Sequence, residues 1–121
     1  DGSFTMTMVE VITAVRYDQP VKWIVLDNDY LGMVRQWQEM FYGRRYSATP
    51  HPCPEFKAIA EGFGARGISI RDRAELADGL NEALRHPGPV VVDVKVEPEE
   101  NVFPMVPAGK SLHEMELGKL A

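Results

Sequence analysis

Three short apolar runs limit this chain to a small set of folds. They occupy 21–26 (VKWIVL), 65–70 (ARGISI) and 90–96 (VVVDVKV), and turn-forming residues such as Pro20 and Pro89 bound them. Continuous runs rich in β-branched residues are typical of parallel strands that are covered on both faces. Segments with helical spacing separate the runs. This alternation predicts an α/β fold with a doubly wound, mostly parallel sheet.

The helical segments have recognisable boundaries. Ser3 or Thr5 is the expected N-cap of the first helix. Asp72 precedes the last long helix, and Glu75 three positions later predicts a capping box. Helices are therefore expected over 4–17, 31–41, 55–62 and 73–85, with a short, weak helix at 112–120.

Size, charge and cysteine content narrow the class of protein. The 121 residues, 45% of them hydrophobic, suffice for one domain with its own core. A formal net charge of −5 argues against a nucleic-acid partner, since nucleic-acid binders normally carry a basic face. The sequence contains no run of 18 apolar residues, so no membrane span is expected. A single cysteine, Cys53, rules out an internal disulfide and suits a cytoplasmic protein.

Two oxygen-bearing side chains flank the first strand. Asp1 opens the chain in Asp-Gly-Ser, and Asn28 follows the run 21–26. A helix and a parallel strand between them return the chain to the same edge of the sheet, where open α/β sheets bind ligands. A carboxylate and an amide oxygen suit Mg²⁺, which completes its shell with water and phosphate oxygens. Free N–H groups at the start of the first helix would favour a diphosphate.

Other conspicuous residues have simpler interpretations. The segment 43–54 is expected to be a loop, and a histidine and a cysteine two apart cannot wrap a tetrahedral ion. His51 is therefore expected to be solvated, and Cys53 to be an unreactive thiol. On the helix 31–41, a stripe of methionine and aromatic residues at helical spacing is by itself typical of core packing; its members are Met33, Trp37 and Met40.

Several of these motifs resemble a known enzyme family. Asp-Gly-Ser, about 25 intervening residues and then Asp27-Asn28 resemble the diphosphate-binding motif of thiamine-diphosphate enzymes, in which the first of the last two residues is usually Asn. Longer runs are similar to the large, catalytic subunits of acetolactate synthases. These runs are 30–38 (YLGMVRQWQ), 41–42 (FY), 45–47 (RYS) and 104–109 (PMVPAG). The resemblance extends over nearly the whole chain, and GMVRQWQ is its most specific part.

The resemblance implies a thiamine-diphosphate-binding fold that lacks its N-terminal part. Residues 1–121 would be the C-terminal domain of a larger enzyme, with 97–121 as its tail. The metal, Mg²⁺, would be held by Asp1, Asn28 and the main-chain carbonyl of Tyr30. The thiamine diphosphate would contact these residues together with Gly2, Ser3, Leu31, Gly32 and Met33. Trp37 would line the substrate pocket and favour 2-ketobutyrate over pyruvate as the second substrate.

The family's activity is the condensation of two pyruvates, or of pyruvate with 2-ketobutyrate, with loss of CO₂ in branched-chain amino-acid biosynthesis. By resemblance, the N-terminal domain, the FAD-binding middle domain and the catalytic glutamate lie outside this chain, so no catalytic residue is expected in it and the isolated chain is expected to be inactive. A homodimer or higher oligomer and a small regulatory subunit are implied partners. Two alternatives remain open, namely another thiamine-dependent carboligase or decarboxylase, and a non-catalytic binding or dimerisation module.

Overall fold

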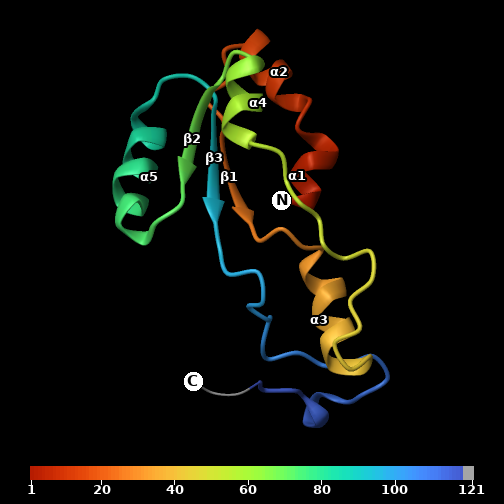
Figure 1. The fold of residues 1–121 in the computed structure, drawn as a ribbon. Helices are drawn as coiled ribbons and strands as arrows, with labels where there is room; N and C mark the ends of the chain where they lie inside the picture. Colours follow the sequence, from red (N-terminus) through yellow and green to blue (C-terminus); the bar gives the residue numbers. More distant parts are fainter. Residues whose placement is uncertain (119–121) are drawn as a thin grey trace.

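A three-stranded parallel sheet forms the centre of the computed structural model, which describes residues 1–118 (Figure 1). The strands are β1 (Lys22–Asp27), β2 (Arg66–Ile70) and β3 (Val90–Lys95), in the order β1-β3-β2. In register, Lys22 and Arg66 both pair with Val90. All three strands therefore end at the same edge, which we call the carboxyl edge. The α/β class and the parallel sheet predicted from the sequence are confirmed.

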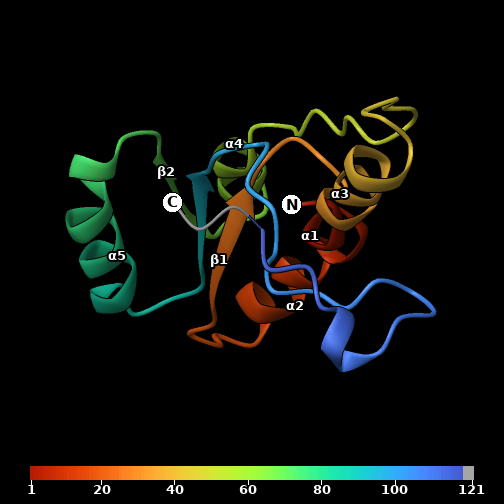
Figure 2. The same ribbon diagram turned by 90° about the horizontal axis from the view of Figure 1, so that it is seen from below.

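Helices cover both faces of this sheet. On one face lie α1 (Gly2–Thr7), α2 (Glu10–Arg16) and α4 (Phe56–Gly62), and on the other lies α5 (Leu76–Arg85) (Figures 1 and 2). Side chains alternate along β3, so that Val91 packs in the α4 layer and Val92 in the α5 layer. The expected doubly wound arrangement is thus present, with one apolar core on each side of the sheet.

The first predicted helix is divided in two. Between α1 and α2, the amides of Val11 and Ile12 donate to carbonyls only three residues back, which tightens the chain into a turn. The N-cap is Asp1, whose carboxylate accepts the amide of Gly2 at 2.6 Å, and is not Ser3 or Thr5. The local pattern signalled helix correctly, but it did not show that the chain must turn to follow the sheet.

Strand β1 is covered on one face only. Val25 and Asp27 are buried beneath the α1, α2 and α4 layer, whereas Ile24 and Leu26 are 51% and 61% exposed on the opposite face. The reason is that α5 packs against β2 and β3 and does not extend over β1. The apolar run predicted a strand covered on both faces, and within the described residues that second cover is missing.

Beyond the carboxyl edge lie α3 (Gly32–Phe41) and the segment that follows β3 (Figure 1). The predicted bounds of α3 are confirmed to within one residue. Its methionine and aromatic stripe is not core, because Met33 and Trp37 are about half exposed. The buried side chains of α3 are instead polar, namely Arg35 and Gln36.

The two 3₁₀ turns complete the fold. The first, η1 (Arg73–Glu75), leads directly into α5, and the predicted capping box of Asp72 and Glu75 is present. The second, η2 (Leu112–Glu114), is all that the structure shows of the helix expected at 112–120, whose last two residues lie outside the described part. Within residues 1–118, no helix combines the length and apolar character needed to cross a membrane.

Candidate functional site

Asp1 and Asn28 meet at the carboxyl edge. The main-chain amide of Asn28 donates to Oδ2 of Asp1 at 3.2 Å, and the main-chain nitrogen of Asp1 donates to the carbonyl of Leu26, also at 3.2 Å. The start of α1 is therefore fixed beside the end of β1. As predicted from their spacing, a helix and a parallel strand return the chain to the edge at which Asp1 and Asn28 lie together.

The loop after β1 presents further oxygen atoms next to Asp1. The side-chain oxygen of Asn28 accepts the amide of Tyr30 at 3.2 Å, which closes a tight turn. Tyr30 also forms an isolated antiparallel bridge with Pro50. Tyr30 lies between β1 and α3. Among the described residues, no main-chain amide donates a hydrogen bond to its main-chain carbonyl. The three expected metal ligands thus lie on two adjacent segments.

Two glycines make this close approach possible. A Cβ atom on Gly32 would lie 3.2 Å from Nδ2 of Asn28, and one on Gly2 would lie 3.1 Å from Cδ2 of Leu31. Both contacts are tight enough to push the neighbouring groups apart. Ser3 is exposed beside Gly2 in the first turn of α1. Gly2, Leu31 and Gly32 therefore lie beside the Asp1–Asn28 pair, and Ser3 follows Gly2 in α1.

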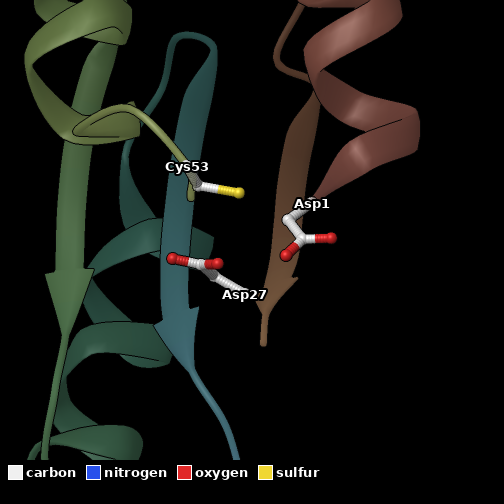
Figure 3. Close-up of side chains that lie close together, drawn as sticks. All are labelled: Asp1, Asp27 and Cys53. Carbon is white, nitrogen blue, oxygen red and sulfur yellow. The ribbon is translucent and has the colours of Figure 1, made fainter. Parts of the chain in front are cut away.

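Asp27 and Cys53 join Asp1 in one cluster, which the sequence did not indicate (Figure 3). One ligand atom from each of the three residues lies within 4.8 Å of the others. Burial, followed by the negative charge of Asp27, raises the pKa of the Cys53 thiol to about 11. The thiol therefore stays protonated at neutral pH in the absence of a metal, and its soft sulfur is not a ligand that Mg²⁺ favours. The effective donors at this edge are oxygen atoms.

An ion pair with the partly exposed Lys95 compensates the charge of the buried Asp27. Although burial opposes ionisation, the hydrogen bond from Lys95 and the amide of Asp29 lower the pKa of Asp27 below its usual value. Nζ of Lys95 lies 3.1 Å from Oδ2 of Asp27 and also contacts the carboxylate of Asp29. Lys95 is not among the site residues predicted from the sequence. A lone lysine at the carboxyl end of an otherwise apolar strand was the available signal.

The loop 43–54 is attached to the loop after β1. The amide of Leu31 donates to the carbonyl of Thr49 at 2.9 Å, and that of His51 donates to the carbonyl of Asp29 at 2.7 Å. His51 is half-buried and packs toward Gly2, with its Nε2 buried and unpaired among the described residues. The expectation that His51 is a solvated loop residue is therefore wrong, since backbone pairing draws its loop against the site.

Trp37 borders a groove on the outer side of α3. The groove has a volume of about 570 Å³ and is lined by Val34, Trp37, Gln38, Tyr42, Arg45 and Ser47. Gln38 holds the facing loop in place, because its side chain bonds both the amide and the carbonyl of Ser47. Met33, the remaining expected cofactor contact, is about half exposed one turn nearer the carboxyl edge. The indole of Trp37 is thus available to a ligand.

The groups gathered at the carboxyl edge suit a magnesium–diphosphate ligand. Each carboxylate oxygen of Asp1 accepts one hydrogen bond, from Gly2 or Asn28, and keeps acceptor capacity for a cation. A carboxylate, an amide oxygen and a main-chain carbonyl are the hard donors that Mg²⁺ prefers. The two glycines let the segments that carry these donors pack closely, because a Cβ atom on Gly2 or Gly32 would lie 3.1–3.2 Å from a side-chain atom of Leu31 or Asn28.

Comparison with known proteins adds an independent observation. Residues 1–94 match the family described as thiamine pyrophosphate enzyme, C-terminal TPP binding domain. The chain is 41% identical to the acetolactate synthase large subunit of Porphyra purpurea, over 95% of this chain and 20% of that protein. It is 42% identical to the mitochondrial acetolactate synthase of Schizosaccharomyces pombe (97% and 18%), and 41% to the isozyme 2 large subunit of Escherichia coli strain K12 (95% and 21%). It spans about a fifth of their length.

Proposed function

Since the chain belongs to the family of C-terminal TPP-binding domains of thiamine pyrophosphate enzymes, we propose that it forms the Mg²⁺- and diphosphate-binding part of an acetolactate synthase. The observation that carries the proposal is the contact between Asp1 and Asn28, side by side at the carboxyl edge. This bond, which the main-chain amide of Asn28 donates, holds the carboxylate of Asp1 next to residue 28, so that oxygen atoms from both segments are available to one ligand.

In this proposal, Asp1, Asn28 and the carbonyl of Tyr30 hold the metal, and Gly2 and Ser3 face the diphosphate. Gly32 lets the backbone approach the cofactor. Thiamine diphosphate, when bound, supplies the carbanion-stabilising chemistry that decarboxylates a 2-oxo acid. The residues of this chain bind and orient it. Lys95 keeps Asp27 and Asp29 from adding two uncompensated negative charges beside the phosphates.

The proposed reaction joins two pyruvates, or pyruvate and 2-ketobutyrate, with loss of CO₂, as a step of branched-chain amino-acid biosynthesis. In this proposal Met33 contacts the cofactor and Trp37 contacts the second substrate. The exposed indole of Trp37, which borders a groove of about 570 Å³, supports the second contact. The longer protein is proposed to supply the N-terminal domain, the FAD-binding middle domain and the oligomer contacts. Its relatives, about five times longer than the matched segment, support this division.

Calorimetry of the full-length protein tests the cofactor site. We expect binding heat only when Mg²⁺ and thiamine diphosphate are both present. Replacing Asn28→Ala should weaken cofactor binding by roughly tenfold or more, because it removes an oxygen ligand and the turn bond to Tyr30. Asn81→Ala is the matched control, since Asn81 is exposed on α5 away from the carboxyl edge. Unchanged affinity in Asn28→Ala, or no heat in the wild type, would contradict the proposal.

Product analysis separates acetolactate synthase from another thiamine-dependent carboligase. In the full-length enzyme supplied with both substrates, Trp37→Leu should lower the 2-ketobutyrate preference by roughly tenfold, because contact with one extra methyl group is worth that much. Phe41→Leu is the control, since Phe41 is an equally exposed aromatic residue of α3 that does not line the groove. Equal product ratios in the two variants would count against the proposed role of Trp37.

A further inference from the structure

The helix that carries Trp37 is anchored by polar groups. Arg35 and Gln36 are each 1% exposed, and they are the buried residues of α3. The apolar side chains of α3 that could pack against a core, such as Val34 and Phe41, are about half exposed. Apolar burial normally fixes a helix in position. Here the position of α3 must depend largely on what Arg35 and Gln36 hold.

Gln36 binds the backbone of the segment after β3. Its Nε2 donates to the carbonyl of Val102 at 2.9 Å, and its Oε1 accepts the amide of Val102, also at 2.9 Å. Nε2 lies 3.2 Å from Sδ of Met105 as well. The side-chain amide thus pairs with Val102 in the way that one backbone residue pairs with another across an antiparallel ladder. Such a pair fixes both position and direction.

Arg35 binds the same segment three residues earlier. Its Nη2 donates to the carbonyl of Glu99 at 3.0 Å and to the side chain of Asn101. Nη1 pairs with Glu39 at 2.9 Å, and Asn101 donates to the same carboxylate at 3.0 Å. Residues 99–102 are therefore held by a closed polar network that is buried where it meets α3.

The guanidinium of Arg35 also reaches toward the cofactor loop. It lies 5.9 Å from the ring centres of both Tyr30 and Tyr46, which form an edge-to-face pair. Tyr30 belongs to the loop expected to hold the metal, and Tyr46 precedes Ser47 at the groove beside Trp37. One side chain thus joins the metal loop, the groove loop and the segment 99–102.

From this network we propose that Arg35 and Gln36 are positioning residues, which fix α3 to the segment 99–105 and thereby set the position of the Trp37 indole and the choice of second substrate. The inference rests on the proposed function. Trp37 follows Gln36 directly, so any rotation of the helix that breaks the Val102 pairing turns the indole within its groove. Substrate selectivity then depends on a contact that touches neither substrate nor cofactor.

The test uses the full-length enzyme with Gln36→Met, which keeps the volume of the side chain and removes both bonds to Val102. Val102→Ala is the matched control, because the Val102 side chain is exposed and its backbone bonds remain. Val102→Pro removes the amide donor from the other side of the pair, and it also fixes φ at 102 and restricts the backbone of Asn101. We would measure amide hydrogen exchange of the peptide 99–105, the dissociation constant for thiamine diphosphate with Mg²⁺, and the product ratio with both substrates.

We expect Gln36→Met to speed exchange in 99–105 by about tenfold or more and to lower the 2-ketobutyrate preference at least threefold, since both hydrogen bonds to Val102 are lost. Val102→Pro should shift the ratio in the same direction, and Val102→Ala should leave it unchanged. The cofactor dissociation constant should stay within about twofold of the wild-type value. That combination distinguishes positioning of Trp37 from a general loss of structure.

Two other outcomes overturn the inference in different ways. Faster exchange with an unchanged product ratio in Gln36→Met and Val102→Pro would show that the contact is structural and leaves Trp37 in place. A wild-type enzyme that forms no thiamine-dependent carboligation product would refute the proposed function, and the inference with it. The exchange measurement does not need activity, so the two failures are distinguishable.

Discussion

Asp93 is a carboxylate buried at the middle of the sheet, on the central strand β3. Its side chain is 1% exposed, and Oδ2 accepts a bond from Arg71 at 2.8 Å, while Oδ1 has no partner among the described residues. Burial raises the pKa of Asp93, and the charge and hydrogen bond of Arg71 offset this effect only in part. The ionised form is therefore less favourable in the folded protein than in the unfolded chain.

Replacing Asp93→Asn should stabilise the protein at neutral pH, because a neutral amide removes the cost of burying the charge, while Arg71 is 41% exposed to water and keeps its ion pair with Glu55. The sign follows from the raised pKa. The free-energy cost of ionising Asp93 in the wild-type protein is absent below its pKa in the unfolded chain, about 3.8. The cost develops as the pH rises through the raised pKa of Asp93 in the folded protein. Denaturant unfolding at pH 7 and at pH 3.5 measures this difference.

The exposed Asp78→Asn on α5 is the control and should change little at either pH. A clear loss of stability in Asp93→Asn at pH 7 would mean that the Arg71 pair contributes more than burial costs.

The thiol of Cys53 is a second group whose chemistry follows from its surroundings. Because its pKa is raised to about 11, by burial first and then by Asp27, very little thiolate exists at pH 8. Alkylation by iodoacetamide should be at least tenfold slower at pH 8 than that of the same cysteine in the unfolded chain, and its rate should keep rising toward pH 11. Mass spectrometry after timed quenching gives the rate. A plateau near pH 9 would contradict this assignment.

At the scale of elements, the capping box in front of α5 gives a direct test. Asp72 accepts the amide of Ala74 at 2.8 Å, and Glu75 accepts the amide of Asp72 at 3.1 Å. Asp72→Ala leaves amides at the helix start without a partner and should cost about 1 kcal/mol in denaturant unfolding. Asp72→Asn should cost clearly less, because asparagine caps nearly as well as aspartate. Equal losses in both variants would show that the charge matters more than the cap.

Elements with a strong local signal were predictable from the sequence. The three strands and the capping box depend on residues close together in the chain, and their bounds were correct to within about one residue. The burial of α3 was not predictable in this way. Gln36 is buried by Val102, which lies 66 positions away, and no periodicity in 31–41 carries that information. The division of the first helix likewise depends on the sheet it must follow.

The site shows the same dependence on distance along the chain. Asp1 and Asn28 were predictable because the connection of a parallel sheet fixes where they meet. Lys95 and His51 were not, since each reaches the site through a side-chain or loop contact that the pattern of elements does not determine. Resemblance to known motifs indicated roles for Asp1 and Asn28, and it indicated none for Lys95 and His51.

At the scale of the whole molecule, the exposed faces of β1 and α3 indicate whether these 121 residues can catalyse a reaction without the rest of the longer protein. Ile24 and Leu26 on the sheet, and Trp37 on the helix, remain about half exposed or more among the described residues. An apolar strand face open to water is normally covered by a further layer. In the proposed function, the groups at the carboxyl edge hold the diphosphate end of the cofactor, and the longer protein supplies the surroundings of its reacting ring.

We therefore expect the isolated 121-residue chain to form no acetolactate from pyruvate, even with saturating thiamine diphosphate, Mg²⁺ and FAD. The full-length protein, assayed in parallel, should form it, because chemistry on the cofactor requires a water-excluding enclosure as well as a metal site. Colorimetric detection of acetoin after acidification measures the product, and Asn28→Ala in the full-length protein gives the background of an impaired metal site. Cofactor-dependent acetolactate from the isolated chain would show that this sheet, with one strand face uncovered, already encloses the reacting ring.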